Sequence, residues 1–241
     1  MGQYVYGKNV VYNLIKKQHN VATLYVLQGH NDGEVVNLAK KNNITIKYVS
    51  KGELDEMTGG KKHQGYVADV EDYPTYSIKE LIAAIPEGKL PLIVALDGIQ
   101  DPHNLGAVLR TGAAVGVDGV IIEKNRSVSL TGTVAKVSAG AIETVKVAQV
   151  TNLSTTLREL KKEGYWIVGT NVHEAQDYRS LKYDMPVVLV IGSEGEGMHR
   201  LVSEQCDFQV KLPMEADTES LNASVACGIL LYEIYSQRFP L

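Results

Sequence analysis

The chain of 241 residues is poor in the features that secreted and membrane proteins depend on. It has two cysteines, and no apolar run approaches the roughly 18 residues that span a bilayer. Cys206 and Cys227 are far apart and form no CxxC pair, so we expect reduced structural thiols rather than a disulfide framework. The N-terminus lacks the apolar core and small-residue cleavage site of a secretory signal. These absences predict a cytoplasmic protein without a membrane segment.

Metal-binding motifs are also missing. The six histidines show neither H-E-x-x-H nor paired Cys/His spacing, so we predict no metal site. The net charge of −4 argues at first against a nucleic-acid partner, but it is unevenly distributed. Residues 1–70 hold nine lysines and six acids, whereas the rest of the chain is acidic. The N-terminal third could therefore tolerate phosphate, although solvated lysines are the commoner reason for a mild excess.

The length favours two domains, and the residue pattern changes accordingly near residue 75. Up to that point short helices and strands alternate, with Ser50 expected to cap a helix over 53–57. Residues 76–90 are interpreted as a connection with a short helix, because Pro86 and Gly88 interrupt the pattern.

Beyond residue 90, nearly continuous apolar runs alternate with helical patterns. Such runs are typical of parallel strands that helices bury on both faces, so we predict an α/β fold with a parallel sheet. The predicted strands are 92–96, 120–122, 166–168 and 187–191, and the predicted helices are 105–115, 153–163, 198–204 and 222–238. Ligands of such sheets bind at the carboxyl ends of strands. The loops that follow the strands are therefore the candidate sites.

The first of these loops leads into a predicted helix. Asp101 and Pro102 suit a helix start, which places Asn104 in the first turn. Helical side chains lean toward the N-terminus, so Arg110 can reach toward Asn104 past small neighbours. Taken alone, this loop is explained as well by Asn104 as a cap and Arg110 in solvent.

The second loop is rich in glycine and runs Gly192-Ser193-Glu194-Gly195-Glu196-Gly197-Met198. The order G-x-x-G-x-G differs from the dinucleotide fingerprint, and no G-K-[ST] follows. Glu194 and Glu196 would repel phosphate groups. The loop therefore favours a cofactor that lacks phosphates or carries positive charge, and a flexible turn is the alternative.

The third loop holds Leu212-Pro213-Met214 and, after an acidic stretch, Ser220-Leu221-Asn222-Ala223-Ser224. Ser220 is expected to cap the helix that follows. Asn222 and Ser224 then project near the backbone N–H groups of the helix start. Capping alone explains Ser220, but it does not explain three amide and hydroxyl side chains together.

Taken together, the three loops resemble the motifs of the SpoU/TrmH family of ribose 2′-O-methyltransferases. The stretch 126–140, with Lys136, Ser138 and Gly140, is similar to the family as well. At the N-terminus, Tyr6-Gly7-Lys8-Asn9-Val10-Val11 and His63-Gln64-Gly65 resemble its L30e-like substrate-binding domain. That domain is typical of the branch that methylates guanosine in large-subunit (23S) ribosomal RNA.

The resemblance implies a fold, a cofactor and partners. The fold is an L30e-like RNA-binding domain over 1–75, a linker over 76–90, and a SPOUT-type domain with a trefoil knot over 91–241. The methyl donor is S-adenosylmethionine, the substrate is ribosomal RNA, and the protein is a homodimer with sites near the subunit interface. Residues that match catalytic and RNA-contacting positions are Asn104, Arg110, Glu194, Ser220 and Asn222. Residues expected to line the cofactor are Thr170, Gly192, Leu212 and Leu221.

The implied reaction is an in-line attack of a ribose oxygen on a sulfonium methyl group, for which the protein mainly supplies alignment. The family's arginine has been regarded as the base. Because a guanidinium resists deprotonation, we favour Arg110 as a phosphate anchor.

Three other functions stay open: a tRNA methyltransferase, a non-catalytic RNA-binding ribosome-assembly protein, and a nucleotide-dependent oxidoreductase. The intact polar set of Asn104, Arg110, Glu194 and Asn222 argues against the second. The glycine order and the two glutamates argue against the third.

Overall fold

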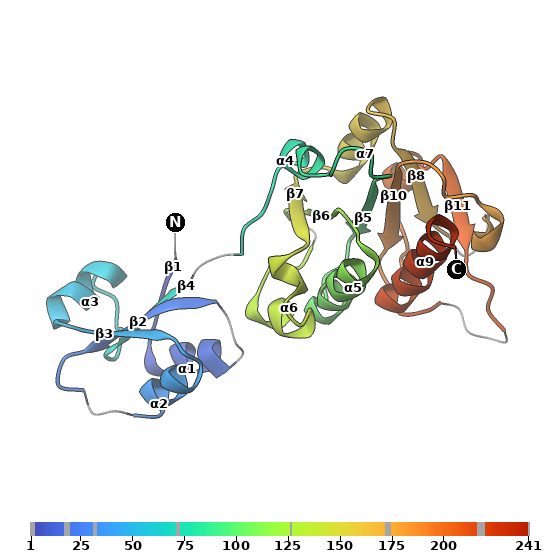
Figure 1. The fold of residues 1–241 in the computed structure, drawn as a ribbon. Coiled ribbons are helices and arrows are strands. Elements are labelled where there is room, and N and C mark those ends of the chain that lie inside the picture. The colour runs from blue at the N-terminus through green and yellow to red at the C-terminus, as the bar shows by residue number, and fades with distance from the viewer. Residues whose placement is uncertain are drawn as a thin grey trace. The chain divides into compact units, whose positions relative to one another are not determined.

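Helices and strands alternate along the chain in the computed structural model and fall into two compact units (Figure 1). The structure describes residues 3–16, 20–30, 33–70, 73–125, 127–171, 175–215 and 220–240. The smaller unit comprises residues 1–73 and 130–136, and the larger unit comprises residues 74–129 and 137–241. Arg126, which begins the family-like stretch 126–140, lies outside the described residues.

The smaller unit has a four-stranded sheet between helices. Its elements are β1 (Gln3–Tyr6), α1 (Lys8–Lys16), β2 (Val21–Leu27), α2 (Glu34–Lys41), β3 (Thr45–Val49), α3 (Lys51–Thr58) and β4 (Tyr66–Val70). The strand order is β1-β4-β2-β3, with β2 and β3 parallel and the other pairs antiparallel. Because side chains alternate along a strand, Leu24 and Ala68 face α1 and α2 and form one core with them. Helix α3 lies on the other side of the sheet (Figure 1).

The predicted cap of α3 is confirmed. The Ser50 hydroxyl accepts a hydrogen bond from Glu53 N, and Ser50 N donates to the Glu53 carboxylate. This reciprocal pair satisfies two donors that a helix start leaves free.

The larger unit is built on a seven-stranded sheet of order β7-β6-β5-β10-β8-β11-β9, and every neighbouring pair is parallel, as predicted. Its strands are β5 (Leu92–Asp97), β6 (Gly119–Glu123), β7 (Lys146–Val150), β8 (Trp166–Thr170), β9 (Gln176–Asp177), β10 (Val187–Gly192) and β11 (Phe208–Lys211). Its α-helices are α4 (Ile78–Ala83), α5 (Pro102–Val115), α7 (Leu153–Lys162), α8 (Arg200–Ser203) and α9 (Ala223–Arg238), and the 3-10 turns are η1 (Ala141–Glu143) and η2 (Tyr178–Ser180). Helix α6 (Gly132–Val137) lies almost entirely in the stretch 130–136, which is grouped with the smaller unit.

The stretch 76–90, interpreted from the sequence as a connection, belongs structurally to the larger unit. Tyr76 forms a parallel bridge with Ala148 of β7, and Leu81 of α4 is fully buried in a core with Ile93 and Ile121. Ser77 caps α4 with the same reciprocal pattern as Ser50. The amphipathic helix in this stretch therefore covers the sheet instead of crossing solvent.

The sheet order decides where the chemistry lies. Strands β5, β10, β8 and β11 are consecutive neighbours, so their carboxyl ends lie side by side. The residues that close β5 and β10, Asp97 and Gly192, are direct partners in register. The three loops picked out from the sequence therefore start from one edge of the sheet. No helix among the described residues is long and apolar enough to cross a bilayer.

Candidate active site

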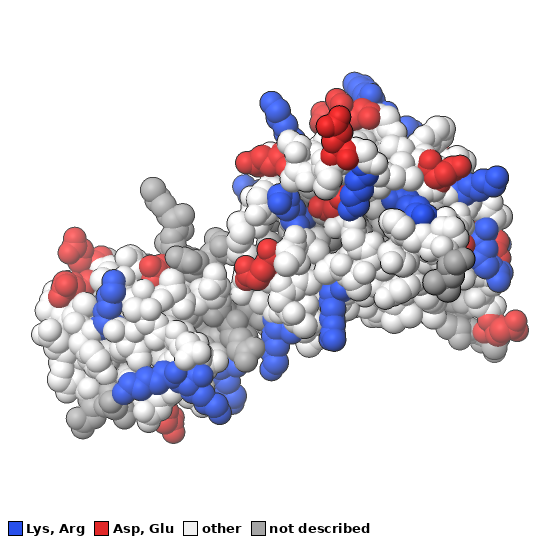
Figure 2. All heavy atoms as spheres, in the orientation of Figure 1, with Lys and Arg blue, Asp and Glu red and all other residues white. Residues whose placement is uncertain are grey.

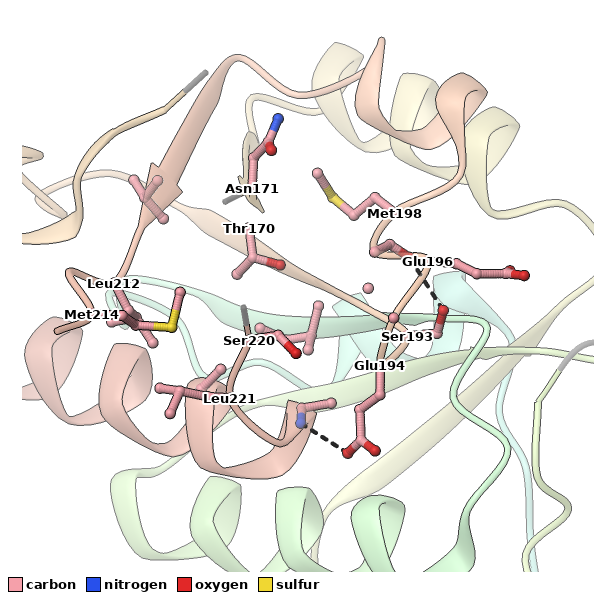
Figure 3. A pocket seen from close by; sticks show the side chains of 17 residues that line it. Thr170, Asn171, Ser193, Glu194, Glu196, Met198, Leu212, Met214, Ser220 and Leu221 are labelled. Atoms are coloured by element: carbon pink, nitrogen blue, oxygen red, sulfur yellow. Dashed lines mark hydrogen bonds between the residues drawn. The ribbon is translucent and has the colours of Figure 1, made fainter. Parts of the chain in front are cut away.

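A cavity of about 600 Å³ opens at this edge of the sheet (Figure 3). All four residues expected to line a cofactor, Thr170, Gly192, Leu212 and Leu221, line it. Besides Glu194 and Ser220, the structure adds lining residues that were not predicted to contact the cofactor, although several belong to the second and third loops; they are Asn171, Ile191, Ser193, Gly195, Glu196, Gly197, Met198, Val210, Met214, Ala223 and Ala226. The cavity therefore has apolar walls from β10, β11 and α9 and one wall of glycine-loop backbone.

The glycine loop is a closed turn. The backbone N–H of Ser193 donates to the carbonyl of Gly197, and the carbonyl of Ser193 accepts from the N–H of Gly197, both at 3.0 Å. A Cβ atom on Gly192 would lie 2.3 Å from the carbonyl carbon of Gly197 and 2.4 Å from Met198 N. A side chain cannot fit there, so glycine at 192 is required for the loop to fold back on its own strand.

Glu194 joins all three loops. Its Oε1 atom accepts hydrogen bonds from Asn104 Nδ2 at 3.0 Å, from Ala223 N at 3.2 Å and from Asn222 Nδ2. Asn222 Nδ2 also donates to Asn104 Oδ1 at 2.9 Å. Bonds to a charged acceptor are stronger than neutral ones, so this cluster fixes the glycine loop against the starts of α5 and α9.

The N-cap of α9 corrects one sequence prediction. The cap is Asn222, whose Oδ1 accepts from Ser224 N at 3.0 Å and Val225 N at 3.2 Å, and not Ser220. The helix starts two residues later than a Ser220 cap requires, and the chain before it passes along the cavity. Ser220 thus lines the cavity beside Leu221, while Asn222 serves both the helix and Glu194.

Arg110 and Asn104 share α5 but differ in environment. Asp101 caps this helix through His103 N at 2.9 Å, as predicted, and Asn104 in the first turn is only 7% exposed. Arg110 is exposed and, within the described ranges, has no hydrogen-bonded or ionic partner. The expected approach of Arg110 to Asn104 is therefore not made here. Its guanidinium is free to meet a ligand.

Sequence reasoning missed a contact behind the glycine loop. The Asp97 carboxylate, 1% exposed at the end of β5, accepts from His199 N at 2.6 Å and lies 2.7 Å from His199 Nδ1. His199 directly follows Met198, so Asp97 anchors the far end of the loop. The sequence does hold a sign of this contact, because Asp97 ends an otherwise apolar strand. A buried carboxylate requires hydrogen-bond donors.

The two thiols have no reactive character. Burial, with a smaller contribution from Asp207, raises the pKa of Cys206 to about 12, and burial raises the pKa of Cys227 to about 12. Both thiols are therefore protonated at neutral pH and behave as packed side chains. Among the described residues, no group of three or more potential ligands could hold a metal ion.

Two family models match the chain in the order of its units. The model of RNA 2′-O ribose methyltransferase substrate binding matches residues 4–76, and the SpoU rRNA methylase model matches residues 91–232. The chain belongs to the SpoU/TrmH family of RNA 2′-O-methyltransferases. The SpoU model includes all nine residues proposed for the site, from Asn104 to Asn222.

Similar proteins span the full chain. YacO of Bacillus subtilis, named for the TrmH family of tRNA/rRNA methyltransferases, is 48% identical over 98% of this chain and 96% of its own length. A Staphylococcus aureus protein with the same family name is 44% identical over 97% of this chain and 96% of its own length. Among solved structures, the SpoU methyltransferase AviRb of Streptomyces viridochromogenes with AdoMet has a TM-score of 0.66 at 22% identity, over 98% of this chain and 90% of AviRb. At that identity the likeness shows the fold.

Proposed function

We propose that this SpoU family member transfers a methyl group from S-adenosylmethionine to the ribose 2′-hydroxyl of a guanosine in 23S ribosomal RNA. The observation that carries the proposal is the joining of Asn104, Glu194 and Asn222 directly beside a cavity lined by the glycine loop. Both features occupy the carboxyl edge of a parallel sheet, where ligands of such folds bind. A cytoplasmic location, where ribosomal RNA is made and modified, is part of the proposal.

The cavity residues fit S-adenosylmethionine better than a phosphate-bearing cofactor. Glu194 and Glu196 line it, and carboxylates repel phosphate but favour a sulfonium. Leu212 and Leu221 offer apolar contact for an adenine ring, and the backbone of the glycine loop offers donors and acceptors. Two structures of similar fold, AviRb and a Sinorhizobium meliloti rRNA methyltransferase, contain AdoMet.

The protein's own part in the reaction is alignment. S-adenosylmethionine supplies an electrophilic methyl group when bound. Asn104, Glu194 and Asn222 hold the edge of the cavity in one arrangement, and alignment of this kind supplies several kcal/mol. We assign Arg110 to the phosphate beside the reacting ribose, because its guanidinium is exposed, permanently charged and without a partner in the part of the chain that the structure describes.

RNA recognition is proposed for the smaller unit. On the face shown in Figure 2, acids lie over α3 and a row of lysines lies over the region of α1 and α2, although a basic side chain also lies near α3 and an acid near that row. Lys61 and Lys62 precede β4, and Lys8 begins α1. The backbone N–H of Lys8 donates to Gln64 Oε1 at 3.0 Å. Exposed lysines suit contact with a phosphate backbone.

A homodimer is proposed from the surface of α9. Val225, Ile229 and Tyr232 recur at helical spacing on this helix and are 50%, 38% and 54% exposed, and Phe239 beyond its end is 61% exposed. A single chain rarely leaves such a stripe in water, whereas a second copy would bury it. Because α9 also carries the cavity wall at Ala223 and Ala226, the interface would lie next to the active site.

The substrate is tested by offering the full chain labelled S-adenosylmethionine with either 23S ribosomal RNA or bulk tRNA. Transfer to ribosomal RNA is expected. Transfer to tRNA alone would identify the alternative substrate, and binding of either RNA without transfer would identify a non-catalytic RNA-binding protein.

A further inference from the structure

The sheet of the smaller unit has a face that its helices cover only at one end. Side chains of Leu24, Val26 and Ala68 point to α1 and α2, so their neighbours along the strands point away. The pairing of β2 with β4 shifts register between Val21 and Thr23, so Val21 and Leu24 both face this core although they are three positions apart. Some residues of the sheet point away from α1 and α2 and also lie outside the end that α3 covers. We call this set the open sheet face, and its members are Tyr4, Thr23, Tyr25, Thr45, Lys47 and Asp69.

Solvent exposure differs between the end of the sheet that α3 covers and the opposite end. Leu54 of α3 and Val67 of β4 are fully buried, so α3 covers the end of the sheet where β1 finishes. At the other end Tyr4 is 41% exposed, and Thr45 and Lys47 are exposed as well. Two tyrosines and a lysine thus stand on a pleated surface.

The aromatic rings on the open sheet face are held in a defined geometry. The ring centroids of Tyr4 and Tyr25 are 6.1 Å apart with the planes 81° apart, an edge-to-face arrangement. Lys47 Nζ lies 5.9 Å from the centroid of Tyr25. The rings are therefore preorganised by each other and by the sheet, which lowers the entropy lost when a planar ligand stacks on them.

We propose that the open sheet face binds unpaired nucleobases of the RNA substrate. This rests on the proposed function and goes beyond it by naming the form of RNA and the residues that contact it. Aromatic side chains on a sheet stack on exposed bases, whereas a duplex hides its base faces. The open sheet face lies inside residues 4–76, which match the substrate-binding family model.

The two charged residues on the open sheet face decide on which side of it the RNA backbone lies. In register, Asp69 stands between Tyr4 of β1 and Thr23 of β2, while Lys47 stands on the edge strand β3. A carboxylate repels phosphate and accepts from base N–H groups, and a lysine attracts phosphate. The bases therefore lie over the tyrosines, and the backbone runs along Lys47 and Thr45.

The test measures the affinity of the full chain for a short fluorescein-labelled single-stranded RNA and for a duplex of the same sequence. Tyr4→Ala and Tyr25→Ala should each weaken single-strand binding about 10-fold, since one stacked base is worth that much or more. Tyr4→Phe should stay within about twofold of wild type, because the ring persists. The matched control is Tyr48→Ala, which removes an exposed ring from the opposite face of β3.

A substitution at the exposed Lys47 keeps the test valid if the tyrosine-to-alanine variants fail to fold. Lys47→Glu should weaken binding and make it less dependent on salt, with circular dichroism unchanged. Unchanged affinity in Lys47→Glu and in folded tyrosine variants would overturn the proposal, and so would an equal loss in Tyr48→Ala. A change in oligomeric state with RNA affinity intact would assign the face to a second copy and also overturn it. Methyl transfer by the wild-type chain is scored separately, so failure of the proposed function is distinguishable.

Discussion

Asn222 holds Glu194 against the start of α9. Its amide nitrogen donates to the Glu194 carboxylate and to Asn104, while its amide oxygen caps the helix through Ser224 N and Val225 N. One side chain therefore has a structural task and a positioning task. The two tasks use different atoms, so substitutions can separate them.

Replacing Asn222 should reveal both tasks. Asn222→Ser keeps a capping oxygen but loses both amide donors, whereas Asn222→Ala loses the cap as well. We expect methyl transfer to fall by about 100-fold in both variants, because small displacements of a positioned site are that costly. Urea unfolding should show a further loss of about 1 kcal/mol only in Asn222→Ala. Wild-type turnover by Asn222→Ser would exclude the positioning task.

Gly192→Ala should weaken cofactor binding without unfolding the chain. The added Cβ would meet the backbone of Gly197 and Met198, so the glycine loop must open. We expect affinity for S-adenosylhomocysteine to fall about 10-fold or more by calorimetry. Gly228→Ala is the control, because its Cβ meets only the Thr111 methyl at 3.8 Å. Equal affinities in both variants would remove the glycine loop from the cofactor site.

Arg238 should be a major contributor to the stability of the larger unit. Its guanidinium donates to the carbonyls of Tyr183, Leu90, Pro91 and Met185, and burial lowers its pKa. Removing a charged donor leaves several carbonyls unsatisfied, so Arg238→Met should lower the free energy of unfolding by about 3 kcal/mol. Arg200→Ala, at an exposed arginine of α8, is the control for urea unfolding. A change below about 0.5 kcal/mol in Arg238→Met would contradict the assignment.

A charge on the α9 stripe should separate the proposed dimer. Tyr232→Glu places a carboxylate in an apolar interface, where it would be buried without a partner. Light scattering after size exclusion should then give the monomer mass, against twice that mass for wild type. Leu201→Glu changes a comparably exposed apolar residue of α8 and should leave the dimer intact. A wild-type monomer would refute the dimer outright.

Much of the larger unit follows from local pattern. Apolar runs such as β5 and β10 are buried on both faces, and their helical partners carry clear caps, so the parallel sheet and the positions of the loops are predictable. The edge strands β7 and β9 and the neighbouring short strand β11 were missed, because these partly buried strands have no continuous apolar run. The knot implied by the family resemblance stays a prediction.

The composition of the site was predictable, whereas its connections were not. Three loops pointed to Asn104, Glu194 and Asn222, but which atoms bond depends on strand order, which no local pattern contains. For the same reason the cap was assigned to Ser220 instead of Asn222, and the contact of Asp97 with His199 was missed across 102 positions.

The most direct measurement is the identity of the methylated nucleoside. The full chain is incubated with labelled S-adenosylmethionine and 23S ribosomal RNA, which is digested and separated by mass spectrometry. We predict label in 2′-O-methylguanosine, its loss in Arg110→Ala and Arg110→Lys with S-adenosylhomocysteine affinity unchanged, and its retention in the exposed control Arg158→Ala. Label on a base, or wild-type turnover by Arg110→Ala, would contradict the proposed reaction or the role of Arg110.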